Sequence, residues 1–115
     1  MPIENLLRAL LEEPGVVGAA LVDGVTGLVY GSVGHAPDAE ECSRYAGLVG
    51  DHMHIAGGRG GLEGIVITGA RHQVVLRSFV RRGDPVLLAA ALERSTANLA
   101  LVTRRIDSCG AQVTG

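Results

Sequence analysis

Two uninterrupted apolar runs constrain this chain more than any other feature. Val16–Val22 and Val86–Leu92 each extend over seven residues when glycine is counted as apolar. A membrane-spanning helix needs about 20 such residues, so neither run can cross a bilayer. Their length and their valine and leucine content instead predict strands buried on both faces, with Val86–Leu92 at the centre of a sheet.

Turn and cap signals divide the rest of the sequence into short helices and strands. Helices are predicted over Ile3–Glu13, from Asp38 to about Ala56, and from Glu93 or Ser95 to Gly110. Further strands are predicted at residues 28–33, 62–68 and 73–80, and residues 111–115 are expected to be a loose tail. The order α-β-β-α-β-β-β-α predicts one α+β domain over residues 1–110. Its five-stranded, mainly antiparallel sheet is expected to carry helices on its faces.

The chain contains no lysine, because all ten of its basic residues are arginines. Walker A loops, Schiff-base and pyridoxal chemistry, and the kinase and penicillin-binding signatures all need a lysine and are therefore excluded. Residues 1–70 carry nine acids and three arginines, whereas residues 71–115 carry three acids and seven arginines. Either these halves interleave and cancel, or they form a dipolar surface that orients a partner. With a net charge of −2 and three aromatic residues, the chain is not expected to bind nucleic acid.

No arrangement of polar residues predicts an active site or a metal centre. His52 and His54 are two positions apart, so on a helix they point about 200° apart and cannot hold one ion. Cys42 and Cys109 form no CxxC motif and are expected to be free, partly buried thiols. The N-terminus lacks the basic cluster of a signal peptide, so a cytoplasmic location is expected. These observations favour a binding protein with no cofactor over an enzyme.

The helix predicted after Asp38 carries more apolar surface than one contact with a sheet requires. Gly47 and Gly50 lie within it, although each glycine costs up to ~1 kcal/mol relative to alanine. Glycines three residues apart allow a neighbouring element to approach closely, and a GC-rich genome would also place glycine there. The two apolar stripes consist of Cys42, Ala46, Val49, Met53 and Ala56, and of Tyr45, Leu48 and Ile55.

Three segments, taken in order, resemble the roadblock/dynein light-chain family. Residues 14–27, PGVVGAALVDGVTG, are similar to the family pattern PGV-GA-LVD--TG, which joins the first helix to the first hairpin. Residues 62–68, LEGIVIT, resemble the third strand of the family, and residues 97–101, ANLAL, resemble the start of its last helix. The likeness extends over about residues 3–108. The glycine-rich loop at 57–61 and the glycines inside the second helix depart from it.

The resemblance implies a profilin-like layered fold, with the second helix on one face of the sheet and the other two on the opposite face. It also implies a homodimer, in which third strands pair edge to edge and second helices pack together. Members regulate or scaffold small Ras-like GTPases, some bacterial relatives activate them, and similar domains occur beside a sensor-kinase-like protein. No catalytic residue is carried over. The implied dimer contacts are Gly47, Gly50, Leu62, Ile65 and Ile67, and the implied partner contacts are Glu41, Arg44, Tyr45, Leu48 and His52.

Two other hypotheses stay open. Related profilin-like folds often hold small ligands, so the chain could be a small-molecule sensor, although its few polar residues within apolar strands argue against this. Alternatively, Arg59 or Arg71, each placed in a predicted turn, could act as an arginine finger on a GTPase. Surface arginines in turns are common, which makes this the weaker alternative.

Overall fold

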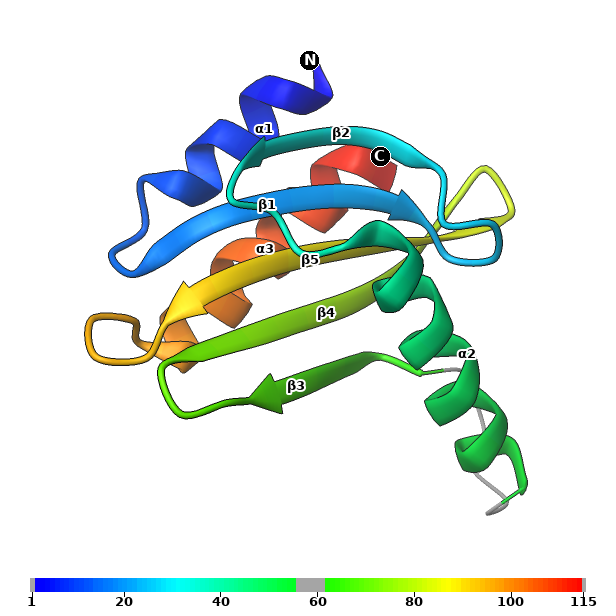
Figure 1. Cartoon of the computed structure of the whole chain (residues 1–115). Coiled ribbons are helices and arrows are strands. Elements are labelled where there is room, and N and C mark those ends of the chain that lie inside the picture. The colour runs from blue at the N-terminus through cyan, green and yellow to red at the C-terminus, as the bar shows by residue number, and fades with distance from the viewer. Residues whose placement is uncertain (1, 56–61, 115) are drawn as a thin grey trace.

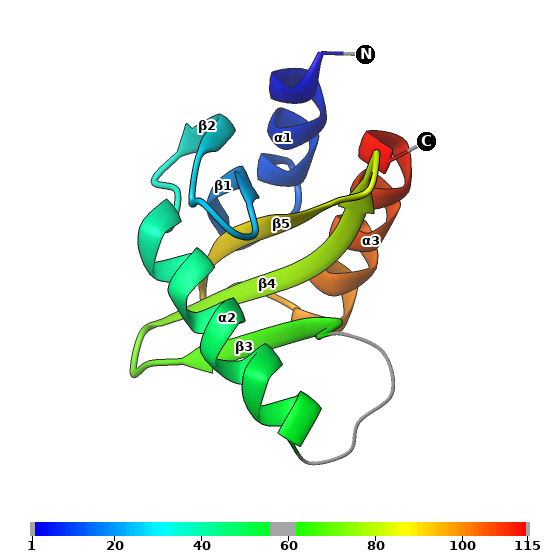
Figure 2. The ribbon, with the colours of Figure 1, turned by 90° about the vertical axis from the view of Figure 1, so that its right-hand side faces the viewer.

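The chain folds into one antiparallel sheet with helices on both faces, as seen in a computed structural model that describes residues 2–55 and 62–114 (Figure 1). The strands lie in the order β2-β1-β5-β4-β3. Helices α1 and α3 cover one face, and α2 lies on the other (Figure 2). This arrangement confirms the predicted α+β fold and its element order. The elements are α1 (Ile3–Leu11), β1 (Val16–Asp23), β2 (Val29–Gly34), α2 (Ala39–Ile55), β3 (Gly64–Thr68), β4 (His72–Arg81), β5 (Asp84–Glu93) and α3 (Leu99–Thr114).

The two apolar runs form the middle of the sheet. Strand β1 pairs with β5 over most of its length, and Ala19, Leu21 and Leu88 are completely buried. Strand β5 has neighbours on both sides, as predicted, because β4 pairs along its other edge. Strands without charged side chains in their middle can occupy this position, since both of their faces are covered.

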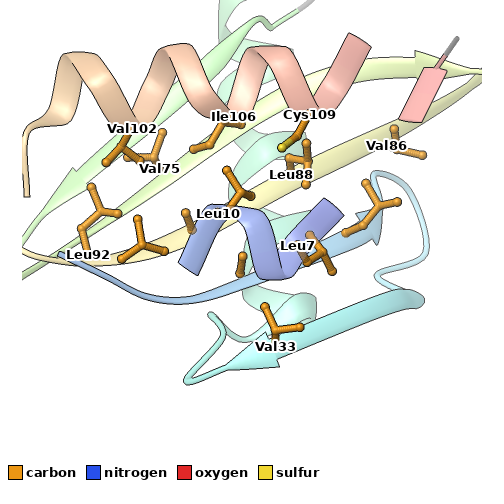
Figure 3. Packing of buried hydrophobic residues seen from close by; sticks show 14 residues of the cluster. Leu7, Leu10, Val33, Val75, Val86, Leu88, Leu92, Val102, Ile106 and Cys109 are labelled. Carbon is orange, nitrogen blue, oxygen red and sulfur yellow. The ribbon is translucent and has the colours of Figure 1, made fainter. Parts of the chain in front are cut away.

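The larger of two hydrophobic cores lies between the sheet and helices α1 and α3 (Figure 3). The leucine face of α1 and the apolar face of α3, both predicted from the sequence pattern, meet over β1, β5 and β4, on one sheet face as the family resemblance implies. Ion pairs also fasten α3, because Asp107 binds Arg77 of β4 at 2.9 Å and Arg105 lies 3.6 Å from Glu13. The helical side chains in this core are Leu7, Leu10, Val102, Ile106 and Cys109.

The core beneath α2 is smaller. Cys42 is the buried α2 residue of this cluster, which otherwise consists of five buried side chains of the sheet and the partly buried residues around them. Figure 1 shows α2 crossing this face near one end of the sheet. Among the described residues, no helix covers the other half of the face, toward the turn between β3 and β4.

The last helix lies further along the chain than predicted, because it begins at Leu99 and not at Glu93 or Ser95. Gly110 is predicted to end it and residues 111–115 to form a loose tail, but α3 continues through Gly110 to Thr114. A Cβ atom at position 110 would overlap the Phe79 ring of β4, so this glycine allows close packing of α3 and does not act as a helix stop. The predicted end of the second helix, at Ala56, lies outside the described residues.

Candidate interaction surfaces

Strand β3 forms one edge of the sheet. It pairs with β4 in a regular register from Gly64↔Arg77 to Thr68↔Gln73, and no described strand pairs with its other edge. The sequence Gly-Ile-Val-Ile-Thr contains no charge and no proline, and both Val66 and Ile67 are exposed. Natural edge strands usually carry charges, prolines or bulges that prevent pairing with another chain. Strand β3 has none of these features.

The opposite edge, β2, is different. Its pairing with β1 shifts register between Leu21 and Val22, which marks a bulge or irregularity. It ends at Gly34, whose φ of +62° lies in the left-handed region. Such irregularities twist an edge away from a regular ladder. The two edges therefore differ in how readily they could accept another strand, and β3 is the better template.

Helix α2 begins at a well-formed cap. The Asp38 carboxylate accepts a hydrogen bond from the Glu41 N–H at 2.9 Å, and the Asp38 carbonyl accepts one from the Cys42 N–H at 3.0 Å. Burial, followed by the nearby charges of Asp38 and Glu41, raises the pKa of the Cys42 thiol to about 11. This thiol therefore stays protonated at neutral pH and is not a nucleophile.

Five residues of α2 are predicted partner contacts, and the structure describes the side chains of four of them. All four lie on the exposed side of the helix. Glu41, Arg44, Tyr45 and Leu48 are all exposed, and Leu48 keeps 63% of its surface in solvent. The His52 side chain lies outside the part of the chain that the structure describes. A leucine and a tyrosine left in water on one helix indicate a surface available for another molecule.

The two helical glycines face a groove at one end of the sheet. Gly47 and Gly50 line a cavity of about 310 Å³ between α2 and the ends of β4 and β5, which Val80, Pro85 and Leu87 also line. Leu62, a predicted dimer contact, borders the same groove. At 100° per residue, Tyr45 lies about 160° around the helix from Gly47, so it projects from the other flank. The structure thus separates the glycines from Tyr45.

The turn beside this groove is held by Asp23. Its Oδ1 accepts hydrogen bonds from the backbone N–H groups of Val25 and Thr26, both at 2.8 Å, and its Oδ2 accepts one from the Tyr30 hydroxyl at 3.1 Å. The Thr26 and Val25 hydrogen bonds lower the pKa of the Asp23 carboxyl. The Arg81 guanidinium stacks 5.9 Å from the centre of the Tyr30 ring. Asp23, part of the quoted family pattern, therefore has a structural role in the turn.

A polar concavity of about 520 Å³ occupies the opposite end of the sheet. It is lined by Arg71, His72 and Arg94, together with Glu93, and all four are exposed. The Arg94 guanidinium donates a hydrogen bond to the Gly69 carbonyl at 3.0 Å. Arg71 lies in the turn between β3 and β4, whereas Arg59, the other proposed arginine finger, lies outside the described residues. The site is an open surface and contains no buried polar group.

The described part of the chain shows neither a metal site nor a membrane-spanning helix. Within residues 2–55 and 62–114, no three His, Cys, Asp or Glu side chains are grouped closely enough to hold a metal ion. Both cysteines are buried and unpaired. In the same part of the chain, every helix is too short or too polar to cross a bilayer.

Comparison with solved structures decides the fold. The sequence matches no protein-family model, and curated proteins give no significant match. An MglB structure with a tetrameric arrangement has a TM-score of 0.81 and 19% identity, over 97% of this chain and 85% of that one. A Roadblock/LC7 domain from Streptomyces avermitilis has a TM-score of 0.77 and 19% identity, over 94% and 91% of the two chains. The chain has the Roadblock/LC7 fold.

A third structure supports the same conclusion. Myxococcus xanthus MglB has a TM-score of 0.79 and 20% identity, over 98% of this chain and 85% of that one. The roadblock fold suggested by residues 14–27, 62–68 and 97–101 is thereby confirmed. At this level of identity the likeness concerns the fold, so the role of each residue is argued from the geometry of this chain.

Proposed function

We propose that this chain is a homodimeric, non-catalytic regulatory or scaffold module for a small Ras-like GTPase, which it activates or tethers. The observation that carries the proposal is the regular, uncharged β3 edge beside a half-covered apolar sheet face, on a roadblock fold. The family resemblance supplies the class of partner. The two surfaces described below supply the means of assembly and recognition.

In the proposed homodimer, the β3 strands of two copies pair edge to edge. Ile65 and Ile67 lie opposite Leu76 and Val74 of β4, so their side chains share the sheet face that carries α2. The uncovered half of that face lies on the Tyr45 flank of α2, because the opposite flank faces the groove. A partner's α2 placed there would cover the exposed Tyr45 and Leu48. This burial of apolar surface would stabilise the dimer.

This geometry changes the assignment of several predicted contacts. We place Ile65, Ile67, Tyr45 and Leu48 in the homodimer interface. Gly47, Gly50 and Leu62 border the groove on the other side of α2, so they are not needed for β3 pairing. Glu41 and Arg44 remain candidate contacts for the GTPase, because they are exposed on α2.

The test is to purify the chain with small Ras-like GTPases of the same genome and measure binding and GTP hydrolysis. The proposal predicts a complex at micromolar concentration, a changed hydrolysis rate, or both. The GTPase in its GDP-bound and GTP-analogue forms serves as its own control, because a regulator is expected to discriminate between them. If no GTPase of the genome binds or changes its rate, the proposal is wrong.

A small-molecule sensor is the second candidate. The observation that favours it is the polar concavity of about 520 Å³ lined by Arg71, His72 and Arg94. Against it, the lining residues are exposed, and ligand sites normally bury most of their ligand. A rise in melting temperature with an anionic metabolite, lost in Arg71→Ala, would favour the sensor function.

A further inference from the structure

The groove lined by Gly47 and Gly50, called the glycine groove from here on, has a shape that the fold itself does not need. A Cβ atom added at Gly47 or Gly50 would meet no atom within 4 Å, so neither glycine is required by packing inside the described chain. Glycine weakens a helix relative to alanine. The two residues therefore keep open a space of about 310 Å³ while making α2 less stable.

Exposed apolar side chains surround this space. Val80 lines the groove with 65% of its surface in solvent. Val25, next to the lining residue Gly24, is 75% exposed, and Ser43 of α2 donates a hydrogen bond to its carbonyl at 3.3 Å. Clustered apolar side chains around a concave surface are typical of protein interaction sites.

Acidic residues lie beside the groove on α2 and just before β3. Asp51 follows Gly50 on α2, Glu63 follows Leu62, and both carboxylates are exposed. Glu40, in the first turn of α2, adds a further acid on the same helix. A partner segment with cationic side chains beside its apolar side chain would therefore be attracted to this groove.

The groove also lies away from the surface assigned to the second copy. The uncovered half of the sheet face lies toward the turn between β3 and β4, on the other flank of α2, and the groove meets β3 only near its start, where Leu62 lines it. One two-fold contact through β3 leaves the glycine flank accessible. The groove is consequently available to a different molecule while the dimer is intact.

We propose that the glycine groove is the docking site of the GTPase, and that it receives one apolar side chain of the GTPase flanked by cationic residues. This inference rests on the proposed function, because it assigns the partner surface of that function. The proposed GTPase surface then consists of the exposed residues Glu41 and Arg44 together with the glycine groove on the same helix.

The test fills the groove in the full-length chain. Because Gly47 has free space around its Cβ position, Gly47→Leu is expected to fold normally and to occupy part of the cavity. Ala111→Leu, at an exposed position on α3, is the matched control. The probe is the purified GTPase that binds the unsubstituted chain, and its Kd is measured by calorimetry alongside the molar mass of each variant.

We expect Gly47→Leu to weaken GTPase binding by about tenfold or more, whereas Ala111→Leu binds normally and both variants stay dimeric. Asp51→Asn is expected to weaken binding at low salt and less at high salt, unlike the distant Glu12→Gln. Unchanged binding by Gly47→Leu would overturn the inference and leave the proposed function intact. Loss of the dimer in Gly47→Leu would also overturn it, because the groove would then be a contact between copies. If the unsubstituted chain binds no GTPase, both proposals fail.

Discussion

Replacement of Ile67 by lysine is expected to dissociate the homodimer without unfolding the monomer. Ile67 lies on the β3 edge and is 38% exposed in the single chain. Complete burial of an isoleucine contributes ~1.5–3 kcal/mol, so covering its exposed part contributes roughly 1 kcal/mol per copy. Two copies meet in a dimer, and losing both contributions raises the dimer Kd about 30-fold. Burying a lysine ammonium adds to this effect.

Molar mass measured by light scattering across a dilution series gives the dissociation constant. Val29→Lys is the matched control, because Val29 is 46% exposed on β2, the irregular edge of the same sheet. The melting temperature of each variant checks that the fold is retained. The reasoning is refuted if Ile67→Lys dimerises as tightly as the unsubstituted chain, or if Val29→Lys is the variant that dissociates.

Three further predictions concern stability. Gly47→Ala and Gly50→Ala should each stabilise the chain by ~0.5–1 kcal/mol, since their Cβ atoms meet open space; a melting temperature that falls would contradict this. Gly110→Ala should destabilise it by about 1–3 kcal/mol in chemical denaturation, because the new methyl group overlaps the Phe79 ring; a neutral result would show that α3 can shift freely. The raised pKa of Cys42, about 11, means that the folded state binds its thiol proton more tightly than the unfolded state. The contribution of this proton to the free energy of unfolding is therefore complete below the ordinary thiol pKa. It is lost as the pH rises toward 11, by at most ~3 kcal/mol, and Cys42→Ala should remove this part of the loss of stability at alkaline pH.

The absence of lysine makes the last measurement unusually clear. No side-chain ammonium titrates between neutral pH and pH 11. The change in the free energy of unfolding at alkaline pH therefore comes chiefly from thiols and tyrosines. Hydrogen bonding to Asp23 raises the pKa of Tyr30, which shifts its titration upward. Denaturation of the chain and of Cys42→Ala at matched pH separates the thiol from the tyrosines.

The sheet could be predicted from sequence because its signals are local. The seven-residue apolar runs specify the central pair β1 and β5, and the alternation in β4 places Val75 and Phe79 toward α3 and Val74 and Leu76 toward α2. Once a segment is assigned as a strand, the alternation of its side chains determines which face of the sheet each residue occupies. The same locality explains the wrong end of α3. A glycine is a common helix stop, and its use as a packing position at Gly110 depends on Phe79, which lies 31 residues earlier in the chain.

The interaction surfaces were only partly predictable. The spacing of Tyr45 and Leu48 predicts the second apolar stripe of α2, and both residues are exposed. Which flank of α2 faces which end of the sheet depends on how the helix crosses the strands, and no local pattern records that crossing. The same applies to Val80, whose alternation places it on an apolar face although α2 does not cover its end of β4.

The proposed role as a dimeric GTPase regulator is tested most directly by the molar mass of the chain mixed with a small Ras-like GTPase in its GTP-analogue state. We expect a complex that contains two copies of this chain. A mixture that separates into free components for every GTPase of the genome would contradict the claim. So would a complex that contains a single copy of the chain.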